Sequence, residues 1–113
     1  MTTQTERLAL SGVIPPMITL LTPEGKVDVA GIERLVNRLI AGGVSGFFVL
    51  GSSGEGPWLT LSDRSLVIAE TVRAAAGRVP VLAGVLEPST VRTVEAAKMA
   101  EQAGADCLVV TSP

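Results

Sequence analysis

The residues best suited to chemistry form one short segment, which reads Gly51-Ser52-Ser53-Gly54-Glu55. We call residues 51–55 the serine loop. Its glycines and two hydroxyl side chains can bring several backbone N–H groups to one concave spot, which suits a carboxylate or a phosphate without a cation. Glu55 adds an acceptor that could fix the loop through its own backbone. The segment predicts an anion-binding loop, with a plain glycine–serine turn as the alternative interpretation.

Two common phosphate-binding motifs do not fit the serine loop. The Lys-Ser/Thr pair of a P-loop is missing, and the glycines are misplaced for the G-x-G-x-x-G dinucleotide pattern. The chain has no histidine, so a general base would have to be a carboxylate such as Glu55 or Glu87, for which the sequence indicates no partner. Asp63 and Arg64 fall in a predicted first helical turn and are interpreted as structural. Cys107 lies in an apolar run, which favours a core position over a reactive thiol.

Alternating apolar segments predict the elements that position this loop. Strands are expected at residues 13–21, 47–50, 81–85 and 106–111 because these runs are apolar almost throughout. The first helix shows an apolar stripe at helical spacing, formed by Ile32, Leu35, Val36, Leu39 and Ile40. Asp28 is its predicted N-cap and Gly42 its end. A second helix is expected from a cap at Ser62 to Gly77, and a third from Ser89 or Thr90 to Gly104.

The predicted order of elements is β-α-β-α-β-α-β with short connections. This order is typical of an α/β fold with a parallel sheet, in which ligands bind at the carboxyl ends of the strands. The serine loop follows the second predicted strand directly. A doubly wound sheet and a barrel both fit the pattern, and the order of elements does not choose between them.

Composition limits the classes of function. The chain has 113 residues, of which 47% are hydrophobic and 3% aromatic, so a Val-, Leu-, Ile- and Ala-rich core is expected. A net charge of −2 argues against a nucleic-acid partner. One cysteine indicates no internal disulfide, and we expect no signal peptide, no membrane-spanning segment and a cytoplasmic location. We predict a tail at residues 1–11 and one domain at residues 12–113.

The serine loop resembles the hallmark of the pyruvate-dependent class I aldolases typified by dihydrodipicolinate synthase and N-acetylneuraminate lyase. In that family the sequence G-T-T-G-E or G-S-T-G-E ends the second barrel strand. Further similarities lie, in the family's order, at residues 43–46, 59–62, 78–84 and 103–106. The resemblance extends over residues 12–113. Three segments depart from it: Thr19-Leu20-Leu21 stands where the first strand usually ends Thr-Pro-Phe, Leu86-Glu87-Pro88 replaces a small glycine- or alanine-rich turn, and Gly56-Pro57-Trp58 is more similar to the family's sugar-acid members. Trp58 either lines a substrate entrance or packs at a helix entry.

The resemblance implies the N-terminal half of a TIM (β/α)8 barrel, with about four parallel strands and three helices. It implies that Ser53 binds the carboxylate of pyruvate or a similar 2-oxo acid and that Ser52 joins a proton relay, while Gly51, Gly54 and Glu55 shape the loop. No metal and no cofactor are implied. The family's Schiff-base lysine lies beyond the fourth strand. Lys26 and Lys98 are unsuited to replace it because neither is expected to be desolvated.

These observations predict a fragment of a pyruvate-dependent aldolase or lyase that lacks the catalytic lysine and is inactive alone. A complete barrel needs about 250 residues. The first alternative is a non-catalytic half-barrel that assembles with itself or a partner, because an unclosed sheet leaves strand edges exposed. The second is an unrelated small anion-binding α/β domain. A homo-oligomer is expected.

Overall fold

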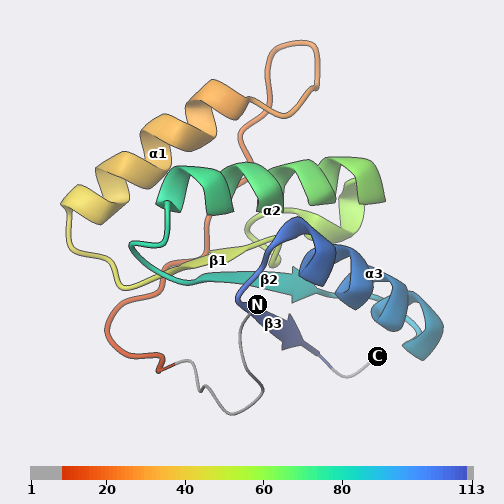
Figure 1. Cartoon of the computed structure of the whole chain (residues 1–113). Coiled ribbons are helices and arrows are strands. Elements are labelled where there is room, and N and C mark those ends of the chain that lie inside the picture. The colour runs from red at the N-terminus through yellow and green to blue at the C-terminus, as the bar shows by residue number, and fades with distance from the viewer. Residues whose placement is uncertain (1–8, 112–113) are drawn as a thin grey trace.

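A computed structural model describes residues 9–111, whose helices and strands alternate along the chain (Figure 1). The elements are α1 (Val29–Ala41), β1 (Phe47–Val49), the short 3-10 helix η1 (Gly56–Trp58), α2 (Leu61–Ala75), β2 (Val81–Val85), α3 (Thr90–Ala103) and β3 (Cys107–Val110). Residues 1–8 of the expected tail, with Ser112 and Pro113, lie outside the described residues. The α/β class is confirmed.

The three strands form one parallel sheet in the order β1-β2-β3. Phe47 of β1 stands opposite Val81 of β2, and Ala83 of β2 stands opposite Leu108 of β3. Parallel neighbours need a crossover between them, and α2 and α3 provide these crossovers. The carboxyl ends of the strands therefore lie together at one edge of the sheet.

The strand expected at residues 13–21 is reduced to a single parallel bridge between Pro16 and Phe48. The amide of Met17 donates to the carbonyl of Phe48 at 2.8 Å, and the amide of Phe48 donates to the carbonyl of Pro15 at 3.0 Å. Pro15 and Pro16 have no N–H, so they cannot extend the ladder. The prediction of a regular strand at residues 13–21 is thus wrong, although the segment does run beside β1.

A side chain caps the first turn of each α-helix, and the sequence predicted two of these three caps. Asp28 caps α1 by accepting from the amide of Gly31 at 2.9 Å, and Ser89 caps α3. For α2 the predicted cap, Ser62, is wrong: the cap is Thr60, whose hydroxyl accepts from the amide of Asp63 at 3.1 Å. Thr60 has an extended backbone, as a capping residue needs, whereas Ser62 already lies inside the helix.

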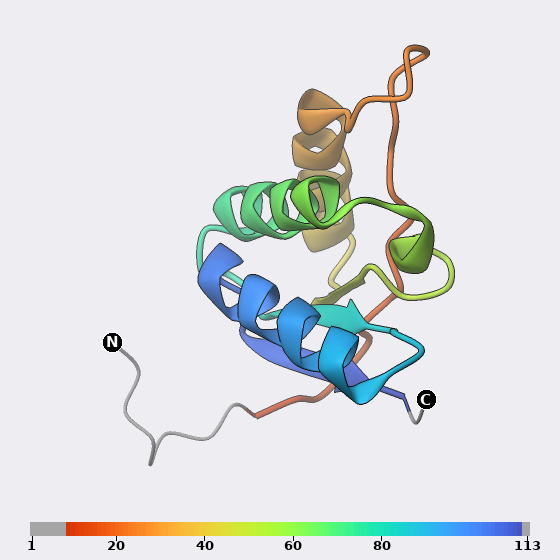
Figure 2. The same ribbon diagram turned by 90° about the vertical axis from the view of Figure 1, so that its right-hand side faces the viewer.

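All three helices cover the same face of the sheet, as the two views show (Figures 1 and 2). The core lies between these layers and includes Phe47, Ile68 and Val81, each at most 1% exposed. At the edge of the sheet, Val110 of β3 is 57% exposed. A doubly wound sheet carries helices on both faces, so this one-sided arrangement is that of a barrel segment.

Among residues 9–111 there is no helix that is both long enough and apolar enough to cross a membrane.

Candidate functional site

The serine loop begins where Leu50 turns the chain at the carboxyl end of β1. Leu50 is 1% exposed and has a φ of 62°, a left-handed conformation that is costly for a residue with a side chain. Glu55, at the other end of the loop, also has a positive φ, of 55°. Two such residues five positions apart reverse the chain sharply, so the loop lies at the edge of the sheet where β1 ends.

Glycines permit close backbone packing around Leu50. A Cβ atom at Gly56 would lie 2.2 Å from the carbonyl oxygen of Leu50, and one at Gly84 would lie 2.5 Å from the same oxygen. At Gly51 a Cβ would lie 2.7 Å from the Phe48 ring, and at Gly54 it would lie 2.9 Å from the backbone amide nitrogen of Leu50. No side chain fits at Gly54, Gly56 or Gly84 without backbone movement, and at Gly51 the Phe48 ring would have to shift, so the glycines fix the path of the loop.

The serines lie at the surface with groups free to bind a ligand. Ser52 and Ser53 are both exposed. Within residues 9–111, the amides of Gly51, Ser52, Ser53 and Gly54 donate no hydrogen bond to a protein acceptor. Gly51 and Gly54 are buried, so the two exposed serines offer the accessible groups: two unpaired amides and two hydroxyls, which can bind a carboxylate or another small anion.

Hydrogen bonds hold the loop from within and from a distant segment. The amide of Glu55 donates to the carbonyl of Ser52 at 3.1 Å, and the amide of Gly56 donates to that of Gly51 at 3.3 Å. The Thr19 hydroxyl donates to the carbonyl of Gly54 at 2.5 Å. Glu55 contributes through its backbone, since its exposed carboxylate accepts no hydrogen bond from the part of the chain that the structure describes. No local sequence pattern predicts this contact of Thr19, which lies 35 positions before Gly54.

A buried ion pair joins the start of α2 to the connection after β2. Arg64, in the first turn of α2, donates to Glu87, in the connection after β2, with 2.6 Å between Nη1 and Oε1. Both residues are buried, at 5% and 8% exposure. The other oxygen of Glu87 lies 3.3 Å from the Arg92 guanidinium. The expectation that Glu87 has no partner is wrong, and its two oxygens are occupied by arginines rather than free to accept a proton from a substrate.

Other residues singled out by sequence lie outside any shared site. Lys26 and Lys98 are both exposed, as expected. Trp58 is 77% exposed, so the interpretation that it packs at the helix entry is wrong for the described residues. Cys107, expected in the core, is half-buried in β3. No group of three or more His, Cys, Asp or Glu side chains within residues 9–111 is placed to hold a metal ion.

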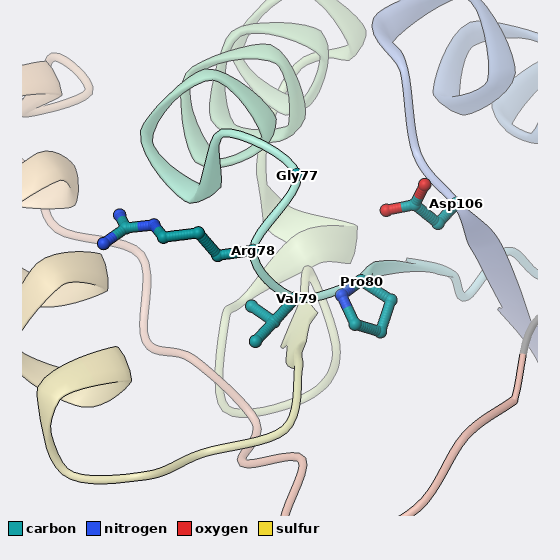
Figure 3. Close-up of a pocket in the computed structure, with 5 residues that line it drawn as sticks. All are labelled: Gly77, Arg78, Val79, Pro80 and Asp106. Atoms are coloured by element: carbon teal, nitrogen blue, oxygen red, sulfur yellow. The ribbon is translucent and has the colours of Figure 1, made fainter.

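A shallow cavity of about 200 Å³ lies at the amino ends of β2 and β3, away from the serine loop (Figure 3). Its polar groups serve the fold: Asp106 accepts from the amide of Val81 at 2.8 Å, and Arg78 points away from Asp106 and donates to Asn37 at 2.7 Å. Substrates of parallel α/β folds bind at the opposite end of the strands. The serine loop is therefore the better candidate site.

Comparison with known proteins identifies a family model and several relatives. The model described as the dihydrodipicolinate synthetase family matches residues 9–113. A 4-hydroxy-tetrahydrodipicolinate synthase of Sorangium cellulosum is 43% identical over 108 residues, which are 95% of this chain and 36% of that protein.

Similar solved structures are also described as dihydrodipicolinate synthases or members of that family. YagE, a prophage protein of the dihydrodipicolinic acid synthase family from E. coli K12 in complex with pyruvate, superimposes with a TM-score of 0.84 at 38% identity, covering 91% of this chain and 35% of that one. A chloride-inhibited dihydrodipicolinate synthase from Acinetobacter baumannii, also complexed with pyruvate, gives a TM-score of 0.88 at 31% identity, covering 93% and 36%. The chain spans about a third of the length of these relatives.

Proposed function

The chain belongs to the dihydrodipicolinate synthetase family, and from this premise we propose that it carries the pyruvate-binding loop of a Schiff-base lyase. Its fold is the N-terminal part of a TIM (β/α)8 barrel, and its relatives are lyases. The proposed reaction of the whole enzyme makes or cleaves a C–C bond at the carbon atom adjacent to the carbonyl carbon of a bound 2-oxo acid. Family membership also removes the interpretation of the chain as an unrelated anion-binding domain.

The observation that carries the proposal is the set of free amides in the serine loop. A pyruvate carboxylate needs several hydrogen-bond donors, and the amides of residues 51–54 face no protein acceptor within residues 9–111. We assign the carboxylate to the hydroxyl and amide of Ser53. Hydrogen bonds to a charged group are worth about 1.5–3 kcal/mol each, so a few of them account for useful affinity.

Ser52 is assigned a role in proton transfer. Its exposed hydroxyl lies beside Ser53 in the loop and can pass a proton along a chain of hydroxyl groups. The chain contains no tyrosine, so the tyrosines that complete the family's relay belong to a part of the enzyme that this chain does not span. Serine in place of threonine keeps the hydroxyl but loses the methyl group that restricts its rotamer.

We also propose that neither lysine of this chain forms the Schiff base. The nucleophile must be a neutral amine, which requires desolvation or a neighbouring cation. Lys26 lies in an exposed turn and Lys98 on the exposed side of α3. The chain by itself is therefore expected to bind pyruvate without forming a covalent adduct.

Replacement of Ser53 by Ala tests the assignment. The change removes one hydrogen bond to a charged carboxylate, so the dissociation constant for pyruvate is expected to rise at least about tenfold. Isothermal titration calorimetry measures it. Ser62→Ala is the matched control, because Ser62 is equally exposed but lies on α2 outside the loop. Equal affinities for the Ser53→Ala variant and the unaltered chain would contradict the assignment.

A second candidate is a non-catalytic half-barrel that assembles with itself. The observation in its favour is the edge strand β3, where Val110 and Leu108 are 57% and 37% exposed. Edge strands with apolar neighbours favour association with another chain.

A further inference from the structure

The Arg64–Glu87 ion pair joins two connections that lie far apart in the sequence. Arg64 follows the serine loop and η1, whereas Glu87 belongs to the connection between β2 and α3. Their side chains are only 6% and 5% exposed, and 2.6 Å separates Nη1 from Oε1. A bond this well shielded from water is not weakened by solvent screening in the way that a surface pair is.

Arg64 also reaches back to the segment that contains the serine loop. Its Nε donates to the carbonyl of Leu59 at 3.1 Å. The amide of Leu59 donates to the carbonyl of Gly56 at 3.1 Å, and the amide of Gly56 donates to that of Gly51 at 3.3 Å. A continuous series of hydrogen bonds therefore leads from Glu87, through Arg64, to the first residue of the serine loop.

Stability alone does not account for a buried pair of this kind. Taking two charges out of water costs several kcal/mol per ion, and apolar residues of similar volume often replace such pairs without loss of stability. The contact that apolar residues could not reproduce is the bond from the guanidinium to the carbonyl of Leu59.

We propose that Arg64 and Glu87 are positioning residues, which hold the serine loop so that its free amides face a substrate carboxylate. This inference rests on the proposed function of the loop. Glu87 orients the guanidinium, and the guanidinium fixes Leu59 and the adjoining η1, on which the loop closes. Thr19 holds the loop independently at Gly54.

The test uses the double variant Arg64→Met/Glu87→Leu, which replaces both charges by apolar side chains of similar size. The free energy of unfolding is expected to be nearly unchanged. The amides of Glu55, Gly56 and Leu59 are expected to exchange with deuterium about tenfold faster, because the guanidinium no longer holds Leu59. The dissociation constant for pyruvate should rise by a similar factor. Glu87→Gln keeps the volume and one acceptor, and its effects should be smaller.

The Glu70–Arg73 pair supplies the control, because it lies on α2 as well but at the surface. A hydrogen bond from the Arg73 guanidinium lowers the pKa of Glu70 below its ordinary value. Glu70→Gln removes this pair and should leave both loop exchange and pyruvate affinity unchanged.

Two outcomes would overturn the inference. One is a double variant in which loop exchange and pyruvate affinity both match the unaltered protein. The other is a uniform loss of stability with normal affinity of the folded fraction, which would make the pair purely structural. Absence of pyruvate binding by the unaltered protein would instead refute the proposed function, and the exchange rates would still decide whether the pair holds the loop.

Discussion

Two glycines pack closely against the carbonyl of Leu50, the residue before the serine loop. Leu50 adopts a left-handed backbone conformation, and Gly56 and Gly84 approach its carbonyl oxygen from two sides. Such a residue persists only where its neighbours enforce it, and strained residues of this kind concentrate at functional sites. The free amides of the loop follow immediately after it, so its geometry determines where they point.

Gly84→Ala should destabilise the protein markedly. The added Cβ would stand 2.5 Å from the Leu50 carbonyl oxygen, a backbone atom that cannot move aside alone. We expect a loss of about 3 kcal/mol in the free energy of unfolding, measured by urea denaturation. Gly42→Ala is the control, since Gly42 has a helical φ of −78° and its nearest neighbour would be 3.4 Å away. Equal losses in the two variants would contradict the crowding described here.

Residue types alone indicated which loop could bind an anion, but not what holds it. The Gly-Ser-Ser-Gly run is recognisable because it follows an apolar strand directly and combines flexible glycines with two hydroxyls, which suits an anion. The bonds from Thr19 to Gly54 and from Arg64 to Glu87 join residues 35 and 23 positions apart. Only the fold brings them together, so no local pattern could predict them.

Helices and later strands were predictable because their signals are local. The apolar stripe of α1 and the cap at Asp28 are patterns read within one or two turns. Two predictions of elements are wrong: the cap of α2 and the strand at residues 13–21. Thr60 and Ser62 are both able to cap α2, and the extended backbone of Thr60 decides in its favour. The apolar run at residues 13–21 matched a strand, but Pro15 and Pro16 limit its pairing with β1 to one bridge.

The layout of the molecule decides between the doubly wound sheet and the barrel, which the order of elements left open. All three helices lie on one face of the sheet (Figure 2), and β3, at the sheet edge, carries the exposed apolar side chains of Leu108 and Val110. In a closed barrel a further strand and helix cover such an edge. The chain therefore presents, as a surface, what its relatives are expected to bury.

A native mass measurement tests whether copies of the chain cover that edge. We expect species at multiples of 11.6 kDa, because an exposed parallel edge strand with apolar side chains favours association. Val110→Lys places a charge at the edge strand and should shift the population toward the monomer. Val91→Lys is the control, since Val91 is 70% exposed but lies on α3, away from the sheet edge. A monomer at all concentrations would contradict the expected association.

The central claim is that the serine loop binds the carboxylate of a 2-oxo acid, and titration of the ¹⁵N-labelled protein with pyruvate tests it most directly. We predict saturable shifts of the amide resonances of Ser52, Ser53 and Gly54. Acetone, which keeps the carbonyl but lacks the carboxylate, should leave these resonances unmoved. Unchanged amides in the serine loop at saturating pyruvate, or shifts confined to Arg78 and Asp106 at the opposite end of the strands, would contradict the claim.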